Sequence, residues 1–234
     1  MIETNPQALP KTLQVSEMLI REIVSGRIPD GSRLPSERQM AADLGIAVGT
    51  LRRALAILED KGLLNRIQGS GNYVQAKASV PSVYSFFRLE LLDGGGLPTA
   101  DIIDVFRLIK PDGMPFIGEG KFAHRIRRLR FLNDRPVALE EIWLDGRFSG
   151  RLSADALSDS LYYFYKEKLR LIIGRVEDSV SVGSVPEWAP EKFTPQTGQS
   201  CGYFERTSFG QDGQAAEFSR NWFDHSVARY RVRL

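Results

Sequence analysis

Residues 31–55 limit most strongly what this chain can fold into. Their sequence, GSRLPSERQMAADLGIAVGTLRRAL, contains two short helical segments separated by a glycine, which predicts two helices joined by a tight turn. An amphipathic segment precedes them, and a hairpin pattern with the turn sequence QGSGN at residues 68–72 follows. This order predicts a winged helix-turn-helix. The second helix of such a unit fits the major groove of DNA, where each base pair exposes a distinct pattern.

Apolar spacing and capping residues set the expected bounds of three helices in this segment. The first covers residues 11–25, with one apolar face formed by Val15, Leu19 and Ile23. The second begins at Ser36, and the Ser36 hydroxyl and the Gln39 amide have the spacing of a capping box. The third covers residues 48–61 and is expected to bury a leucine stripe of Leu51, Leu55 and Leu58.

Composition excludes several classes of protein. The chain has 234 residues, 42% of them apolar, so one or two ordinary packed domains are expected. A single cysteine, Cys201, and two histidines leave little to hold a metal, and we expect neither a metal nor a cofactor. The sequence has no signal peptide and no apolar run of about 20 residues, so we expect a cytoplasmic protein without a membrane partner. Residues 1–77 hold 10 Lys and Arg against 8 Asp and Glu, which places the net charge of +2 in the expected DNA-binding segment.

A series of short motifs resembles the GntR family of bacterial regulators. The motifs are Leu34-Pro-Ser-Glu-Arg38, Leu44-Gly45, Thr50-Leu-Arg52, Ala54-Leu55, Gly62-Leu63, Gly69-Ser-Gly71 and Tyr73-Val74. The resemblance implies contacts to double-stranded operator DNA from Arg38, Thr50, Arg52, Gly69 and Gly71. With their neighbours in the same turns, the candidate DNA-binding residues are Ser36, Arg38, Gly49, Thr50, Arg52, Arg53, Gln68, Gly69 and Gly71.

The chain departs from the family pattern just before the third helix. Many members have Ser and then Arg where this sequence has Ala47 and Val48. Ala is a poor helix cap, and the missing Arg removes a base contact. The operator sequence of a relative therefore cannot be transferred to this chain.

The second half of the sequence predicts a strand-rich domain. Residues 76–82 are small and polar with a proline, which predicts a linker between domains over residues 8–76 and 83–234. Beyond it, β-type residues predict strands over 102–109, 122–132, 137–144, 174–185, 202–209 and 217–223. A helix is expected over 157–169, opened by Ser158 or Ser160, and hairpin turns over 133–136 and 211–214.

This half resembles the UTRA effector domain of the HutC branch of the GntR family. The matching motifs are Arg128-Leu-Arg130, Arg135-Pro-Val-Ala-Leu-Glu140, Ser160-Leu-Tyr162 and Ala216-Glu-Phe-Ser-Arg220. The resemblance implies a two-domain α+β protein whose second domain is a small α/β unit similar to chorismate lyase. It also implies a homodimer and a small-molecule effector such as a phosphorylated sugar, a carboxylate or a similar anion.

Two arginines indicate how an anion could be held. Arg128 and Arg130 alternate on a strand and so share a face, where two guanidinium groups can clamp a phosphate or carboxylate. A basic surface strand is the alternative. The segment Tyr84-Ser-Phe-Phe-Arg88 either packs on the core or lines the site, and Phe223 stands where relatives often have Tyr. The candidate effector-binding residues are Arg88, Arg128, Arg130, Glu140, Ser160, Tyr162, Glu217 and Phe223.

Three functions compete for this sequence. A ligand-responsive regulator, most simply a repressor released from a pseudo-palindromic operator, uses both halves. An enzyme of chorismate-lyase-like fold fused to a DNA-binding unit lacks support, because no paired acids, nucleophile–base motif or cofactor fingerprint is present, and we expect no catalytic residues. A structural DNA binder would not need a second domain with no net positive charge. The sequence names neither the effector nor the regulated genes.

Overall fold

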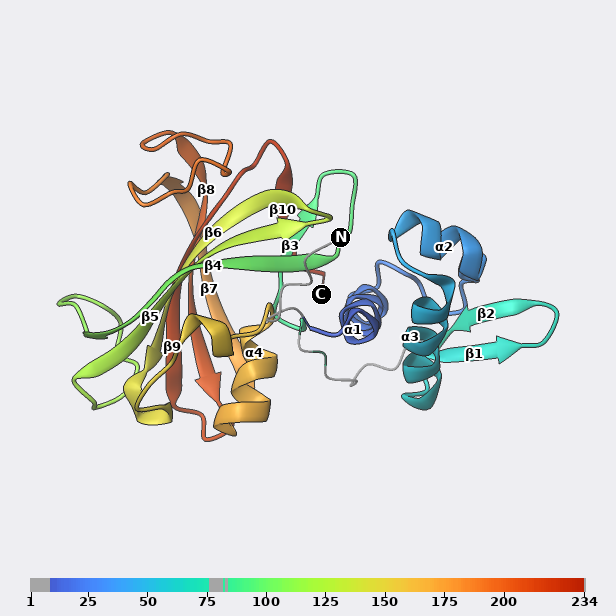
Figure 1. Ribbon diagram of the computed structural model, residues 1–234, viewed down its shortest axis with the longest axis horizontal. Helices are drawn as coiled ribbons and strands as arrows, with labels where there is room; N and C mark the ends of the chain where they lie inside the picture. Colours follow the sequence, from blue (N-terminus) through green and yellow to red (C-terminus); the bar gives the residue numbers. More distant parts are fainter. Residues whose placement is uncertain (1–8, 76–81, 83, 234) are drawn as a thin grey trace.

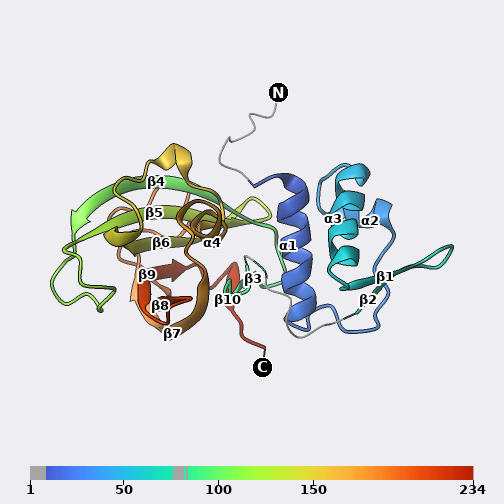
Figure 2. The ribbon, with the colours of Figure 1, turned by 90° about the horizontal axis from the view of Figure 1, so that it is seen from below.

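The chain forms two lobes with helix α1 between them (Figures 1 and 2). The computed structural model describes residues 9–75, 82 and 84–233. Of the expected linker over 76–82, only residue 82 is therefore described, and the expected domain start at residue 8 also lies outside the described part. Among the helices that are described, none is long and apolar enough to cross a membrane.

The smaller lobe is a winged helix-turn-helix, as the sequence predicts. Its elements are α1 (Lys11–Val24), α2 (Glu37–Asp43), α3 (Val48–Asp60) and the antiparallel strands β1 (Leu64–Ile67) and β2 (Gly71–Val74). The leucine stripe of α3 is fully buried and packs with the apolar face of α1. Gly45 supplies the turn between α2 and α3 at φ +61°, a conformation that glycine adopts without strain.

The two helices of the turn region differ in how they are capped at the N-terminus: α2 has a side-chain cap and α3 has none. The Ser36 hydroxyl accepts from the backbone N–H of Gln39 at 3.2 Å, which is half of the expected capping box. The expectation for the other half is wrong, because the Gln39 amide donates to Asp43 at 2.7 Å, one turn along α2. In a capping box the side-chain oxygen of Gln39 would accept from the Ser36 N–H, and the bonds of the described residues include none of that kind. Ala47 precedes α3 without a side-chain cap, as expected from its methyl group.

The larger lobe is built on a six-stranded antiparallel sheet. Its strands are β4 (Pro98–Ile109), β5 (Phe122–Leu132), β6 (Arg135–Asp145), β7 (Ile173–Ser184), β8 (Ser200–Gly210) and β9 (Ala215–Phe223). Their spatial order is β4-β5-β6-β9-β8-β7. The turn between β5 and β6 is shorter than expected: Asn133 and Asp134, at φ 48° and 61°, make it alone, and Arg135 already pairs with Leu132.

Two parts of this lobe differ from the sequence-based expectation. The helix expected over 157–169 begins only after Ser160, whose hydroxyl accepts from the N–H of Tyr163. It comprises α4 (Leu161–Phe164) and a π-helical turn (Tyr165–Leu169). A separate small sheet pairs β3 (Leu89–Leu91) with β10 (Ala228–Tyr230), neither of which was expected. Three residues are too few to display a period, so the sequence carries no signal for them.

Helix α1 is buried on all sides along most of its length. Every residue from Gln14 to Ile23 is buried, although the sequence pattern predicts a single buried face. Val15 and its apolar neighbours pack in the core of the smaller lobe, which Leu97 of the larger lobe also enters. The polar face of α1 meets the larger lobe instead, so this helix belongs to the packing of both lobes.

Candidate DNA-binding and effector-binding sites

The candidate DNA-binding residues are all accessible on the smaller lobe. Those of α2, α3 and the wing are exposed or half-buried, namely Ser36, Arg38, Gly49, Thr50, Arg52, Arg53, Gln68, Gly69 and Gly71. A groove runs between the start of α2 and the tip of the β1–β2 wing, and it is lined by Ser36, Gln68, Gly69 and Gly71 among others. The structure therefore brings the start of α2 and the wing together around one groove.

Two arginines of the smaller lobe, Arg52 and Arg66, lie beside the carboxylate of Glu37. The Nε of Arg52 donates to Glu37 at 2.6 Å, and the Nη2 of Arg66 lies 3.9 Å from the same carboxylate. The Arg52 side chain is 64% exposed, and an exposed pair of this kind contributes only about 0–1 kcal/mol. A DNA phosphate or base can therefore compete with Glu37 for Arg52.

Two further arginines beside the wing were absent from the sequence-based candidates. The Arg33 guanidinium lies so close to Gly71 that a Cβ there would be 3.1 Å from its Nε. Arg66, on β1, bonds Asn72 at 3.2 Å and is exposed. Neither belongs to the motifs quoted above. Only the pairing of residue 33 with Tyr73 and of β1 with β2 places them at the wing.

A small cavity in the larger lobe collects most of the candidate effector-binding residues. Its volume is about 60 Å³, and it is lined by Tyr84, Phe86, Phe87, Arg128, Arg130, Glu140, Ser160, Leu161, Tyr162 and Arg206. We call it the effector cavity. Five of the eight residues expected from sequence line it: Arg128, Arg130, Glu140, Ser160 and Tyr162. Pockets that enclose a metabolite measure roughly 300–1,000 Å³, so a ligand of that size requires the lining to move.

The two arginines on β5 are buried and share one carboxylate. Arg128 and Glu140 are cross-strand partners and form an ion pair, while the Nε of Arg130 lies 3.7 Å from Glu140. Burial lowers the pKa of Arg130. Burial would raise the pKa of Glu140, but Arg128 and Arg130 outweigh it and hold this pKa below its usual value. Two guanidinium groups thus face one carboxylate, and within the described residues neither Nε donates a hydrogen bond.

Arg206 adds a third buried arginine that sequence reasoning missed. It donates through Nε and Nη2 to the two oxygens of Asp178 at 2.6 and 2.7 Å. Burial lowers its pKa, but the hydrogen bonds and the charge of Asp178 raise it by more. Asp178 and Arg206 face each other across β7 and β8. Their opposite charges at paired positions are visible only once the strand register is known.

Three of the expected effector-binding residues lie outside the effector cavity. Glu217 sits behind it, where the hydroxyls of Tyr165 and Ser208 donate to it at 2.6 and 3.0 Å. Phe223 packs in the core against Gly202, whose Cβ would lie 2.2 Å from the Phe223 ring. Arg88 lines a different cavity, at the junction of the two lobes. The positions of these three residues depend on the twist of the strands and on the path of the chain before β3. The spacing of residues in the sequence predicts neither.

Three aromatic residues of the segment Tyr84-Ser-Phe-Phe-Arg88 line the effector cavity, namely Tyr84, Phe86 and Phe87. Phe86 stacks edge-on against Tyr162, with ring centroids 6.1 Å apart. Phe87 lies between two guanidinium groups: Arg130 is 4.7 Å from its ring centroid and Arg21 of α1 is 5.3 Å from it. An aromatic side chain of the cavity is therefore in direct contact with the smaller lobe.

Asp159 makes a second connection between the lobes. Its backbone carbonyl accepts from Nη1 of Arg128 at 3.2 Å and from Nη1 of Arg130 at 2.7 Å. Its carboxylate accepts from Gln14 of α1 at 3.0 Å and from the N–H of Ala100 at 3.2 Å. Burial raises the pKa of Asp159. One residue thus touches both cavity arginines and the helix that packs on the DNA-binding core.

The described residues contain no group of three His, Cys, Asp or Glu side chains placed to hold a metal ion. The single cysteine, Cys201, is buried on β8, and burial raises its pKa to about 11. A thiol with so high a pKa is a poor nucleophile.

Comparison with known proteins gives the same two-part division. A family model described as bacterial regulatory proteins, gntR family, matches residues 11–74, and one described as UTRA domain matches residues 116–229. The HTH-type transcriptional regulator SmoD of Agrobacterium fabrum is 53% identical over 97% of both chains. The mannosyl-D-glycerate transport/metabolism system repressor MngR of Escherichia coli is 27% identical over 92% of both.

A solved structure is similar along the whole chain. The possible transcriptional regulator YydK of Bacillus subtilis superposes with a TM-score of 0.54 at 21% identity, covering 97% of this chain and all of its own. At that identity the likeness shows the fold alone. The gntR family and the two relatives are named as regulators and not as enzymes, so the chorismate-lyase-like enzyme is not supported.

Proposed function

This chain belongs to the GntR family of bacterial regulatory proteins and is a DNA-binding transcriptional regulator with a UTRA effector domain. From that premise we propose that it is a repressor of the HutC branch, released from a pseudo-palindromic operator by a small anionic metabolite. The DNA-binding domain spans residues 8–76 and the effector domain residues 83–234. MngR, a relative over the same length, is named a repressor.

Operator recognition rests on α3 and the wing. The N-terminal turn of α3 enters the major groove, where Arg52 and Thr50 reach base edges or phosphates, while the wing at Gly69 and Gly71 approaches the sugar–phosphate backbone. Arg38 at the start of α2 binds phosphate. Support comes from the accessibility of these residues and from the exposed, weak ion pair between Arg52 and Glu37.

The effector carries a phosphate, a carboxylate or a similar anion together with an apolar or planar part. Arg128 and Arg130 hold the anion, since two buried guanidinium groups share one carboxylate and retain unused Nε donors. Phe86 and Phe87 cover the rest of the ligand. The cavity of about 60 Å³ is smaller than such a ligand, so binding displaces these two side chains.

The observation that carries the proposal is the double contact of Asp159. An anion on Arg128 and Arg130 competes with the Asp159 carbonyl for the same Nη1 atoms, and the carboxylate of Asp159 is bonded to Gln14 of α1. Displacing Phe87 likewise disturbs its contact with Arg21. Effector binding therefore changes how α1, and with it the DNA-binding core, is held. Coupling of this kind amounts to about 1–3 kcal/mol and is reciprocal.

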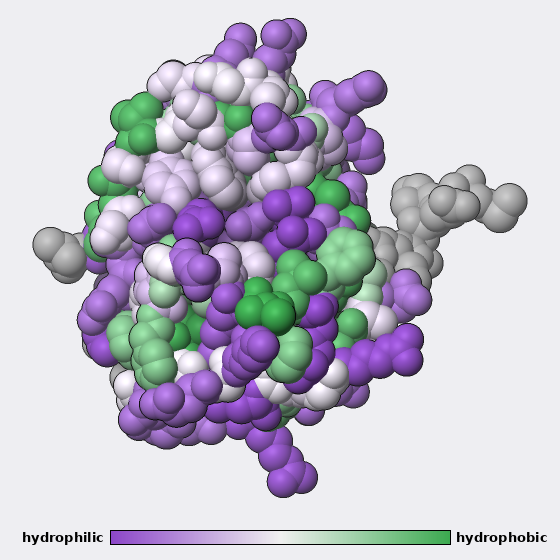
Figure 3. Space-filling view, turned by 90° about the vertical axis from the view of Figure 1, so that its left-hand side faces the viewer, coloured by the Kyte–Doolittle hydropathy of each residue, from purple (hydrophilic) through white to green (hydrophobic). Residues whose placement is uncertain are grey.

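Dimerisation belongs to the effector domain. The end of this domain that faces away from the smaller lobe shows apolar surface among hydrophilic side chains (Figure 3). Strand β4 and the loop after it contribute Phe106, Ile109 and Phe116, which are 53%, 55% and 62% exposed. Exposed apolar side chains on one strand and the loop after it support an interface between protein chains at this edge of the sheet. A homodimer places two α3 helices for the two halves of a pseudo-palindrome.

The central experiment measures operator binding and its release. The intergenic DNA beside the gene is labelled, operator affinity is measured by fluorescence anisotropy, and anionic metabolites are screened by thermal shift. The compound that raises the melting temperature should weaken operator binding. The double variant Arg128→Ala with Arg130→Ala should bind the operator as before and lose the response. A full response from this variant would refute the pocket assignment.

Sedimentation of the full chain tests the dimer. The unsubstituted protein should sediment as a dimer at micromolar concentration, and Phe116→Glu should shift it to monomer. Val182→Glu is the matched control, because Val182 is 73% exposed on β7, the strand at the opposite edge of the sheet. A dimer that tolerates Phe116→Glu but not Val182→Glu would place the interface at the other edge.

A further inference from the structure

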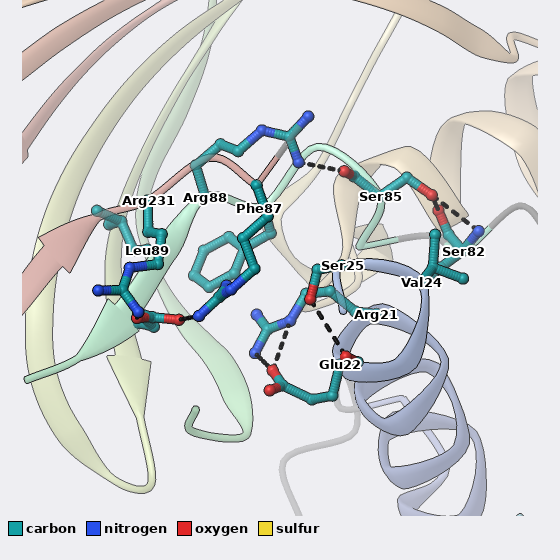
Figure 4. Close-up of a pocket in the computed structure, with 12 residues that line it drawn as sticks. Arg21, Glu22, Val24, Ser25, Ser82, Ser85, Phe87, Arg88, Leu89 and Arg231 are labelled. Atoms are coloured by element: carbon teal, nitrogen blue, oxygen red, sulfur yellow. Dashed lines mark hydrogen bonds and ion pairs between the residues drawn. The ribbon is translucent and has the colours of Figure 1, made fainter. Parts of the chain in front are cut away.

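A second cavity, which we call the junction cavity, lies where α1 meets the strand pair β3–β10. Its volume is about 200 Å³. Arg21 and Glu22 reach into it from α1, while Arg88, Glu90, Arg231 and Arg233 come from the larger lobe. Figure 4 shows the α1 side chains directed toward Phe87 and Arg231 across this space. It is separate from the effector cavity, with which it shares only Phe87.

Arginines outnumber carboxylates around the junction cavity. Glu90 is paired with three of them: Arg229, Arg231 and Arg233 lie 3.1, 3.2 and 2.9 Å from its oxygens. Glu22 is paired with Arg21 and with Arg27. The guanidinium of Arg88 donates to the carbonyl of Ser85 at 2.5 Å, and no ion pair is recorded for it among the described residues. Of the residues that line the cavity, four are arginines (Arg21, Arg88, Arg231 and Arg233) and two are carboxylates (Glu22 and Glu90), which leaves a local excess of positive charge at the contact between the lobes.

One of these arginines is buried with a donor left over. The Arg21 side chain is 8% exposed, and its Nη1 has no hydrogen-bond partner among the described residues. Burial lowers the pKa of Arg21 to about 10, against the opposing influence of Tyr84 and Glu90. Burial also lowers the pKa of Arg88, and the charge of Arg206 lowers it further. A buried donor without a partner costs free energy that a bound acceptor recovers.

We propose that the junction cavity is a binding site for an oxyanion of the phosphate class, separate from the effector cavity. The anion accepts hydrogen bonds from Arg21 on one side and from Arg88, Arg231 and Arg233 on the other. Ser25 and Ser85 also line the cavity, but each hydroxyl already donates to a backbone carbonyl, so the arginines supply the donors. Guanidinium groups suit tetrahedral oxyanions because their forked donors match two oxygens at once. The ion offsets the surplus of arginine charge that Glu22 and Glu90 leave.

Because its donors come from both lobes, the anion fastens α1 to the larger lobe. Arg21 belongs to the helix that packs on α3, and Arg231 and Arg233 follow β10. A ligand that prefers this docked arrangement shifts the protein toward it. If the chain acts as the repressor proposed above, phosphate therefore changes operator affinity without entering the effector cavity. That consequence rests on the proposed function, whereas anion binding itself does not.

The test is a titration of the full chain with inorganic phosphate at constant ionic strength, followed by calorimetry and thermal shift. We expect saturable binding with a dissociation constant at or below about 1 mM. Arg231→Gln should weaken it at least tenfold. Arg229→Gln is the matched control. The side chains of Arg231 and Arg229 pair with the same oxygen of Glu90 and are 42% and 38% exposed, respectively, but only Arg231 lines the cavity. The control should stay within threefold of the unsubstituted protein.

Two further variants separate the sites. Arg21→Gln should also weaken phosphate binding at least tenfold, and Arg130→Gln, which alters the effector cavity, should leave it unchanged. Equal losses from Arg231→Gln and Arg229→Gln would mean that phosphate senses only general charge, and the proposal would be wrong. Loss with Arg130→Gln alone would assign the ion to the effector cavity, again overturning it. A chain that binds phosphate as expected but no operator would refute the proposed function and leave this site standing.

Discussion

The hydrogen bond between Gln14 and Asp159 offers the sharpest test of how the lobes communicate. Replacing Gln14 by Leu keeps the size of a side chain that is 1% exposed and removes its amide. The carboxylate of Asp159 then loses the donor that lies 3.0 Å away, while the N–H of Ala100 remains bonded to its other oxygen. Gln14→Leu therefore cuts one contact between α1 and the larger lobe without opening a void.

The expected magnitude follows from the partners. A hydrogen bond to a charged group contributes about 1.5–3 kcal/mol, so the free energy of unfolding should fall by about that amount in urea denaturation. The ratio of operator affinities without and with the effector found by the thermal-shift screen should shrink by about tenfold or more, since 1.4 kcal/mol corresponds to tenfold. Gln211→Leu is the control, because this exposed glutamine bonds the backbone of its own lobe at Arg170 and Ile172.

The unfolding free energy and the effector response of Gln14→Leu distinguish two ways in which this reasoning could be wrong. If Gln14→Leu lowers the stability but leaves the effector response within twofold of the unsubstituted protein, Asp159 holds the lobes together without transmitting the signal. If neither quantity changes, the contact itself contributes nothing and the route through Asp159 is refuted.

Three other changes have defined outcomes. Arg52→Ala should cost about 1–3 kcal/mol of specific operator binding if the side chain reads a guanine; if it binds phosphate, affinity should fall evenly across sequences and the salt slope by about one, measured by anisotropy. Leu51→Ala, at a fully buried position of α3, should lower the unfolding free energy by about 2–5 kcal/mol. Burial raises the pKa of Glu217 above 4.5, so its contribution to stability is complete below pH 4.5 and is lost as the pH rises through the raised value. The unsubstituted protein should therefore lose stability relative to Glu217→Gln across that window in pH-dependent denaturation, and parallel curves would contradict this.

Local patterns predicted the smaller lobe well because its determinants are local. The leucine spacing of α3, the Ser36 cap and the glycine turns each act within a few residues. The long strands of the sheet were found for the same reason. What escaped prediction depends on residues distant in sequence: the pairing of Arg206 with Asp178 needs the register of β7 and β8, and the burial of Gln14 needs the second lobe.

The same limit applies to the effector-site candidates. Arg128, Arg130 and Glu140 meet because adjacent strands pair their residues, which alternation can anticipate. Phe223 lies on an adjacent strand too, but it packs in the core against Gly202, away from the cavity. Alternation assigns a residue to a face of the sheet, and the position along that face comes only from the full fold.

The two-sided burial of α1 matters to anyone who joins the DNA-reading part of one regulator to the ligand-sensing part of another. A splice in the linker after β2 carries along a helix whose polar face was shaped by a different sensor, so Gln14 and Arg21 would meet foreign partners. A splice after α1 instead sets Val15 and Leu19 against a foreign α3. A working chimera needs a hybrid helix: apolar positions from the donor of the DNA-binding part, polar positions from the donor of the sensor.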